Sequence, residues 1–141
     1  MKKFTIFQLL VTFMFFVSIF AFCIDYALCE NKSENIIWDK TFGGSQNDEV
    51  FSGIKTADGS CAVCGYTESK GAGGYDAWIA KLDENGEMVW DKTFGGSDED
   101  VARCIIQAED GGYVLAGYTE SKGAGRYDAW VVKLDENGNL E

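Results

Sequence analysis

The stretch Trp38–Gly44, which reads Trp-Asp-Lys-Thr-Phe-Gly-Gly, recurs letter for letter as Trp90–Gly96. Around this stretch, residues 38–88 align without a gap with residues 90–140, and 31 of the 51 aligned positions are identical. A repeat of about 50 residues indicates a chain built from similar structural units. The predicted units are residues 36–88 and residues 89–141.

Each unit contains short stretches of alternating apolar and polar residues, separated by turns rich in Gly, Asp and Asn. This pattern predicts strands at residues 36–42, 49–56, 61–67, 76–82, 87–94, 101–108, 113–119 and 128–134. In the second of these stretches, the alternation places Val50, Ser52 and Ile54 on one face. No helical period of convincing length follows residue 30, so we expect this part of the chain to be all-β.

Eight strands divide into two sets of four, and four-stranded antiparallel sheets repeated about an axis are the blades of a β-propeller. The expected fold is therefore two four-stranded blades of an incomplete propeller, because two blades cannot close a ring. Three alternatives follow. The chain is a remnant of a longer gene, an open two-sheet sandwich, or a subunit whose strand at residues 36–42 completes the second unit of the next copy in a cyclic homo-oligomer.

The first 29 residues have the layout of a secretory signal peptide. Two lysines precede an apolar stretch at residues 4–22, and small residues before Glu30 suit a cleavage site. The apolar stretch is also about long enough to cross a membrane as a helix, which needs roughly 20 residues. Residues 1–29 are therefore expected to be a cleaved signal peptide or an N-terminal membrane anchor, with a polar linker at residues 30–35. Either alternative makes the remainder secreted or membrane-anchored outside the cytoplasm, with the membrane contacted only through residues 4–22.

The quoted stretch is followed in the second unit by Asp-Gly-Gly-Tyr-Val-Leu-Ala-Gly-Tyr-Thr and by Asp-Ala-Trp-Val-Val-Lys-Leu-Asp-Glu-Asn-Gly. Over residues 36–141 this pattern resembles the blade repeats of large secreted and surface proteins of bacteria and archaea. The resemblance implies propeller blades that pack against similar repeats. The spacing from Leu82 to Trp90 also resembles the tryptophan-docking motif of quinoprotein propellers, which implies that Trp90, and by repetition Trp38, packs between neighbouring blades.

The composition limits the classes of function that suit this chain. The 141-residue chain has no His and a net charge of −11, so the commonest general base and metal ligand is missing and binding of nucleic acid is disfavoured. Its carboxylate pairs lie in turns, where no catalytic arrangement is evident. We therefore expect a non-catalytic extracytoplasmic module that binds a protein or glycan through loops on one propeller face. The alternative is a calcium- or carbohydrate-binding propeller unit or part of a secreted enzyme.

Four aromatic residues are candidates for a ligand surface or for packing. Trp78 and Trp130 occur in the same Tyr-Asp-Ala-Trp context in the two units, and this identical placement predicts that they fill the blade core. Tyr75 and Tyr127, at the ends of loops, are candidates for stacking on a sugar.

Three acidic residues in turns are candidates for binding calcium, because this cation prefers several oxygen ligands. They are Asp48, Asp98 and Asp100. The competing interpretation is that these side chains accept hydrogen bonds from the backbone of their own turns. No other cofactor is expected.

Overall fold

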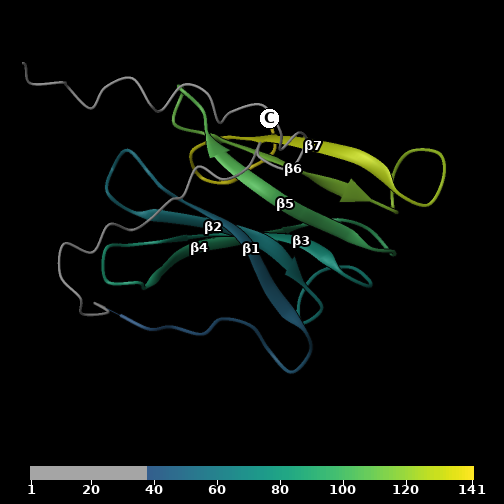
Figure 1. Cartoon of the computed structure of the whole chain (residues 1–141), viewed down its shortest axis with the longest axis horizontal. Helices are drawn as coiled ribbons and strands as arrows, with labels where there is room; N and C mark the ends of the chain where they lie inside the picture. Colours follow the sequence, from purple (N-terminus) through teal and green to yellow (C-terminus); the bar gives the residue numbers. More distant parts are fainter. Residues whose placement is uncertain (1–37) are drawn as a thin grey trace, which may run out of the picture.

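The computed structural model describes residues 38–141, which form two antiparallel sheets that lie against each other (Figure 1). The first sheet has the order β1-β2-β3-β4, and the second has the order β5-β6-β7. The strands are β1 (Asp48–Lys55), β2 (Cys61–Thr67), β3 (Asp76–Leu82), β4 (Met88–Phe94), β5 (Asp100–Gln107), β6 (Tyr113–Thr119) and β7 (Asp128–Leu134). The all-β prediction is confirmed for this part of the chain. The expected N-terminal helix at residues 4–22, the segment 1–29 and the linker 30–35 lie outside the described residues.

Each sheet is an antiparallel meander, because strands that follow one another in the chain are also neighbours in the sheet. Turns in both sheets contain a glycine in the left-handed region, such as Gly59 at φ +88° and Gly86 at φ +73° in the first sheet. Such backbone angles match the twist of tight hairpins and are disfavoured for residues with a side chain. The Asp-Gly and Asn-Gly pairs of the sequence therefore mark the hairpin turns.

Two details of the predicted strand plan are wrong. Within the predicted first strand at residues 36–42, the described residues 38–42 form no strand. The second sheet has three strands rather than four, and only an isolated bridge between Leu134 and Leu140 lies where a fourth strand would begin. The first difference has a physical cause: a strand needs a neighbour for its backbone hydrogen bonds. Residues 90–94 pair with β3, whereas residues 38–42 lack a corresponding partner among the described strands.

The hydrophobic core lies between the two sheets, where β5 packs against β1, β2 and β3. The first sheet contributes small residues and Ile79, while the second contributes larger ones, including Ile105 and the fully buried Tyr113. The buried residues of this core are Ala62, Cys64, Ala77, Ile79, Ala102, Ile105, Tyr113, Leu115, Val132 and Leu134. The repeat units are therefore joined by one shared core rather than by separate ones.

Candidate functional site

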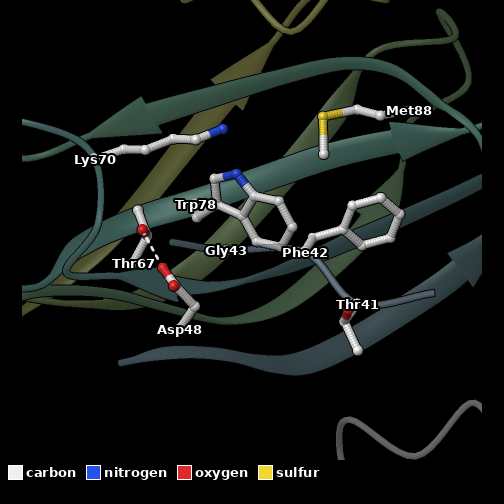
Figure 2. A pocket seen from close by; sticks show the side chains of 8 residues that line it. All are labelled: Thr41, Phe42, Gly43, Asp48, Thr67, Lys70, Trp78 and Met88. Carbon is white, nitrogen blue, oxygen red and sulfur yellow. Dashed lines mark hydrogen bonds between the residues drawn. The ribbon is translucent and has the colours of Figure 1, made fainter. Parts of the chain in front are cut away.

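A cavity of about 210 Å³ lies between residues 41–43 and the face of the first sheet that points away from the second sheet (Figure 2). Its lining residues are Thr41, Phe42, Gly43, Asp48, Thr67, Lys70, Trp78 and Met88. Polar lining groups that belong to the sheet already have partners: Asp48 accepts a hydrogen bond from Thr67, and Lys70 forms an ion pair with Asp91. Ligand pockets usually measure about 300–1,000 Å³. This cavity is therefore a weak candidate for a substrate site.

A more extensive site is a row of aromatic side chains that crosses both sheets. We call it the aromatic row, and its members are Phe51, Tyr66, Tyr75, Arg103, Tyr118 and Tyr127. In the first sheet, the ring centroids of Tyr66 and Tyr75 are 4.4 Å apart. Phe51 follows, with its ring centroid 5.8 Å from that of Tyr66. These separations are typical of rings in direct contact.

Arg103 connects the two halves of the aromatic row. Its guanidinium carbon lies 4.1 Å from the ring centroid of Phe51 and 5.6 Å from that of Tyr118. Tyr118 in turn meets Tyr127 edge to face, with 5.0 Å between centroids. Because a guanidinium over an aromatic face is attracted by the ring quadrupole, Arg103 holds the halves together by two cation–π contacts.

A β-bulge in each sheet explains how Phe51 and Arg103 reach the row. The first bulge falls between Val50 and Ser52, and the second lies at the same place in β5. A bulge leaves one residue out of the pairing and redirects its side chain. The prediction that Val50 and Ser52 share a face is therefore wrong, because they pair with consecutive residues of β2.

The aromatic row has an acidic rim that consists of Glu49, Glu68, Glu99 and Glu120. The negative charge of Glu68 is the main cause that raises the pKa of Tyr75, and Glu120 is the main cause for Tyr127. Burial is the main cause that raises the pKa of Tyr66. The hydroxyl groups of these tyrosines therefore stay protonated at neutral pH and can donate hydrogen bonds, while the rim repels anionic ligands.

The row contains the predicted candidates Tyr75 and Tyr127 and brings them into one surface with four residues that the sequence reasoning missed. Tyr75 is half-buried, whereas Tyr127 is 55% exposed. Tyr66 and Tyr118 carried a signal, since both occur in the repeated Gly-Tyr-Thr. Nothing in the sequence marked Phe51 and Arg103, because a bulge cannot be recognised from the alternation of apolar and polar residues alone.

Trp38 and Trp90 have equivalent positions in the two units. Trp90 packs against the core, meets Tyr113 edge to face at 5.8 Å, and lies against Gly138. Trp38 lies in the same way against Gly86. Trp90, in β4 of the first sheet, thus contacts the Asn-Gly turn after β7 of the second sheet, whereas Trp38 contacts the equivalent turn of its own repeat unit.

Trp78 and Trp130 differ in burial. Trp78 is buried, and its Nε1 donates a hydrogen bond of 2.9 Å to Asp91. Trp130 is half-buried against the core, and the ammonium of Lys122 lies 4.7 Å from its ring centroid. Both therefore serve packing rather than the aromatic row.

The calcium candidates Asp48 and Asp100 fasten loops at equivalent places. The Oδ2 atom of Asp48 accepts hydrogen bonds from Gly44 N at 2.9 Å and Ser69 Oγ at 2.8 Å. Burial by itself raises the pKa of Asp48, but its hydrogen bonds together outweigh this effect and lower the pKa. The oxygens that calcium would need are thus already engaged.

Asp100 accepts the corresponding bonds from Gly96 N at 2.8 Å and Ser121 Oγ at 2.6 Å. The third candidate, Asp98, is exposed and accepts a hydrogen bond from Ser97 Oγ at 3.0 Å. Within residues 38–141 there is no group of three or more His, Cys, Asp or Glu side chains placed to hold a metal ion. Calcium binding at these residues stays a prediction.

Comparison of the chain with models of protein families found no match, and comparison with curated proteins found no similar sequence. In the part of the chain that the structure describes, no helix is long and apolar enough to cross a membrane.

Proposed function

We propose that the protein is a non-catalytic binding module of β-propeller type that works outside the cytoplasm, and that the aromatic row is its ligand-binding surface. The extracytoplasmic location rests on the signal-like residues 1–29, and the propeller type rests on the 52-residue repeat and its stacked antiparallel sheets. The observation that carries the binding role is the recurrence of the tyrosine pair in both units. Tyr66 with Tyr75 and Tyr118 with Tyr127 form one surface through Arg103.

The chemistry of the aromatic row favours a carbohydrate over an anionic ligand. Flat aromatic faces bury the apolar faces of sugar rings, and protonated phenols donate hydrogen bonds to sugar hydroxyls. The glutamate rim disfavours sulfated or phosphorylated ligands and favours neutral or amino sugars. This also supports carbohydrate binding as the specific form of the role, ahead of catalysis.

Titration of the chain with neutral, amino-sugar and sulfated oligosaccharides, followed by intrinsic fluorescence, tests the proposal. We expect saturable binding of the neutral or amino-sugar ligands and none of the sulfated ones. Tyr127→Ala should weaken binding about tenfold, since a ring contact contributes up to about 1.5 kcal/mol. The matched control is Val89→Ala, at another exposed apolar position outside the aromatic row.

Two results would contradict the proposal. Affinity that is unchanged in both Tyr75→Ala and Tyr127→Ala would remove the aromatic row as the binding surface. Release of shorter sugars during the titration would show catalysis, and the module would then belong to an enzyme.

A further inference from the structure

We propose that the free edge of β7 binds residues 38–42 of a second copy of this chain, and that the exposed face of the second sheet stacks on the first sheet of that copy. This inference deepens the proposed function and rests on its propeller-type stacking. The partner is a second copy of the same chain, and the contact with it repeats the contact between the two units.

The first observation is the exposed face of the second sheet. Ile79 in β3 is fully buried by the second unit, whereas its repeat counterpart Val131 in β7 is 69% exposed. Ile106 is 55% exposed, whereas its counterpart Ile54 is partly buried against the core. The same face also exposes Ala116 and Ala129, whose counterparts Cys64 and Ala77 are buried. The second sheet thus presents to solvent the same apolar face that the first sheet uses to bind a following unit.

The second observation is the free edge of β7. On one side β7 pairs with β6 over its whole length, and on the other its contacts among the described residues are at its end, where Leu134 bridges Leu140 and Lys133 O accepts a hydrogen bond from Glu141 N. This bridge repeats the pairing of Leu82 with Met88, which begins β4. An edge with unpaired backbone groups is a template for a further strand.

The third observation is a segment that fits this edge. Residues 38–42 have the same sequence as residues 90–94, which form the body of β4. Residues 38–42 already contact the first unit in the way that residues 90–94 contact the second unit. Trp38 contacts Gly86, and just after the segment Gly44 N donates a hydrogen bond to Asp48. The segment therefore needs no rearrangement of these contacts to pair with the β7 of another copy.

The pairing of β3 with β4 fixes the expected register. There, Ile79 pairs with Lys92, and Trp78 pairs with Thr93. Shifted by one repeat, Val131 of one copy should pair with Lys40 of the other, and Trp130 with Thr41. A change of register by one residue would place the apolar side chains on the wrong face, so only this pairing keeps the pattern.

Polar groups around β7 complement the incoming strand. In the first sheet, Asp91 accepts a hydrogen bond from Trp78 Nε1 and forms an ion pair with Lys70. The corresponding donors in the second sheet are Trp130 and Lys122, and the ammonium of Lys122 lies over the Trp130 ring. In the assembly, Asp39 of the second copy takes the place of Asp91. The incoming strand thus supplies a carboxylate acceptor for Trp130 and Lys122.

A contact of this kind is head to tail, because the two surfaces that meet are different. Such contacts close into a ring when the rotation between units is right. Propellers have about four to eight blades, so two, three or four copies of two units each would close a ring of four, six or eight.

The experiment uses the full chain in detergent and measures its mass by native mass spectrometry. We expect the wild-type chain to form a closed oligomer of about two to four copies and Val131→Glu to lower the mass to that of one chain, because the glutamate would be buried in the contact. The matched control is Val89→Glu: Val89 is also exposed, and its repeat counterpart is Glu141. This control should keep the wild-type mass, while circular dichroism checks that both variants fold.

A second measurement does not depend on the folding of a variant with a buried charge. A photo-crosslinking amino acid at position 131 should capture residues 38–42 of another copy, as identified by mass spectrometry of the crosslinked peptides. A wild-type mass of one chain, an unchanged mass for folded Val131→Glu, or capture within one chain or onto a different protein would overturn the inference. A single-chain protein that still binds oligosaccharides through Tyr127 would remove the assembly alone, and an assembled protein without binding would remove the ligand surface alone.

Discussion

β3 and β7 have nearly the same sequence, Asp-Ala-Trp-Ile-Ala-Lys-Leu and Asp-Ala-Trp-Val-Val-Lys-Leu, but they differ in burial. Six of the seven residues of β3 are buried, whereas only Val132 and Leu134 are buried in β7. The cause is the neighbour: β3 lies between the second unit on one face and residues 38–43 on the other, while β7 has the first sheet on one face alone. Burial in a repeat protein is therefore set by what stacks on each unit, more than by the strand itself.

The first strands of the two sheets, β1 and β5, show the opposite relation, and there the sequences differ. β5 lies against the first sheet, and its Val101 and Ala102 are buried. The counterparts in β1 are Glu49 and Val50, and both are exposed. At Glu49 the side chain is thus charged where burial is lost, whereas Val50 stays apolar although it is exposed, as Val131 does.

The largest effect is expected for truncation of the equivalent residues Ile79 and Val131. Ile79→Ala should lower the free energy of unfolding by about 2–5 kcal/mol, because it leaves a cavity between the sheets. Val131→Ala should change it by no more than about 0.5 kcal/mol in the dissociated chain, because the side chain is exposed there. Urea unfolding followed by tryptophan fluorescence at low protein concentration measures both. Equal losses at every concentration would show that the two sheets are buried alike, and the comparison would fail.

The next effect concerns the glycines beneath the two tryptophans. A Cβ added at Gly138 would lie 2.7 Å from Trp90 Cζ3, whereas one added at Gly111 would meet nothing within 4 Å. Both positions have a positive φ, so Gly111→Ala should cost about 1–2 kcal/mol from backbone strain alone. Gly138→Ala should cost about 1–3 kcal/mol more, because Trp90 is held in the core.

Gly86→Ala tests whether Trp38 is held as firmly as Trp90. The added Cβ would lie 2.5 Å from Trp38 Cδ2, but Trp38 belongs to a segment without a strand partner among the described residues. This tryptophan can shift more easily than Trp90, so the loss in melting temperature should be smaller than for Gly138→Ala. A larger loss for Gly86→Ala would mean that residues 38–42 are held as firmly as β4.

The strands of this fold could be predicted from the sequence to within one residue wherever alternation and turn residues agree. Predicted strands at residues 61–67 and 76–82 coincide with β2 and β3, because Asp-Gly and Asn-Gly turns fix their ends. Residues 38–42 show the limit of this reasoning. Their sequence is identical to that of residues 90–94, so the pattern predicted a strand, but pairing depends on a neighbour that local sequence does not contain.

The candidate site could be predicted only in part. Tyr75 and Tyr127 were identified from their loop positions, but the aromatic row also needs Phe51 and Arg103. These two residues are at equivalent positions and have unrelated side chains, so the repeat gave no reason to link them. Their contact arises from two bulges and from the stacking of the sheets, and both are tertiary features.

The smallest expected effect is a difference in acid sensitivity between the two equivalent hairpins. Asp58 accepts hydrogen bonds from Lys81 Nζ at 2.7 Å and from Thr56 Oγ1 at 2.5 Å, and these hold the pKa of Asp58 well below its usual range. Lys133 Nζ, at 2.7 Å, is the main cause that lowers the pKa of Asp110, but the counterpart of Thr56 there is an alanine. The first hairpin therefore favours the ionised carboxylate more strongly.

A lowered pKa in the folded state means that the ionised group stabilises the fold above its unfolded pKa of about 3.9. This stability is lost as the pH falls from about 4 through the lower folded pKa. Asp58→Asn should therefore flatten the acid limb of the melting temperature against pH more than Asp110→Asn does. The effect should be small, because both carboxylates are largely exposed and water screens their ion pairs. An equal flattening by the two variants would show that the Thr56 hydroxyl adds nothing, and that the two hairpins are equivalent in charge as well as in shape.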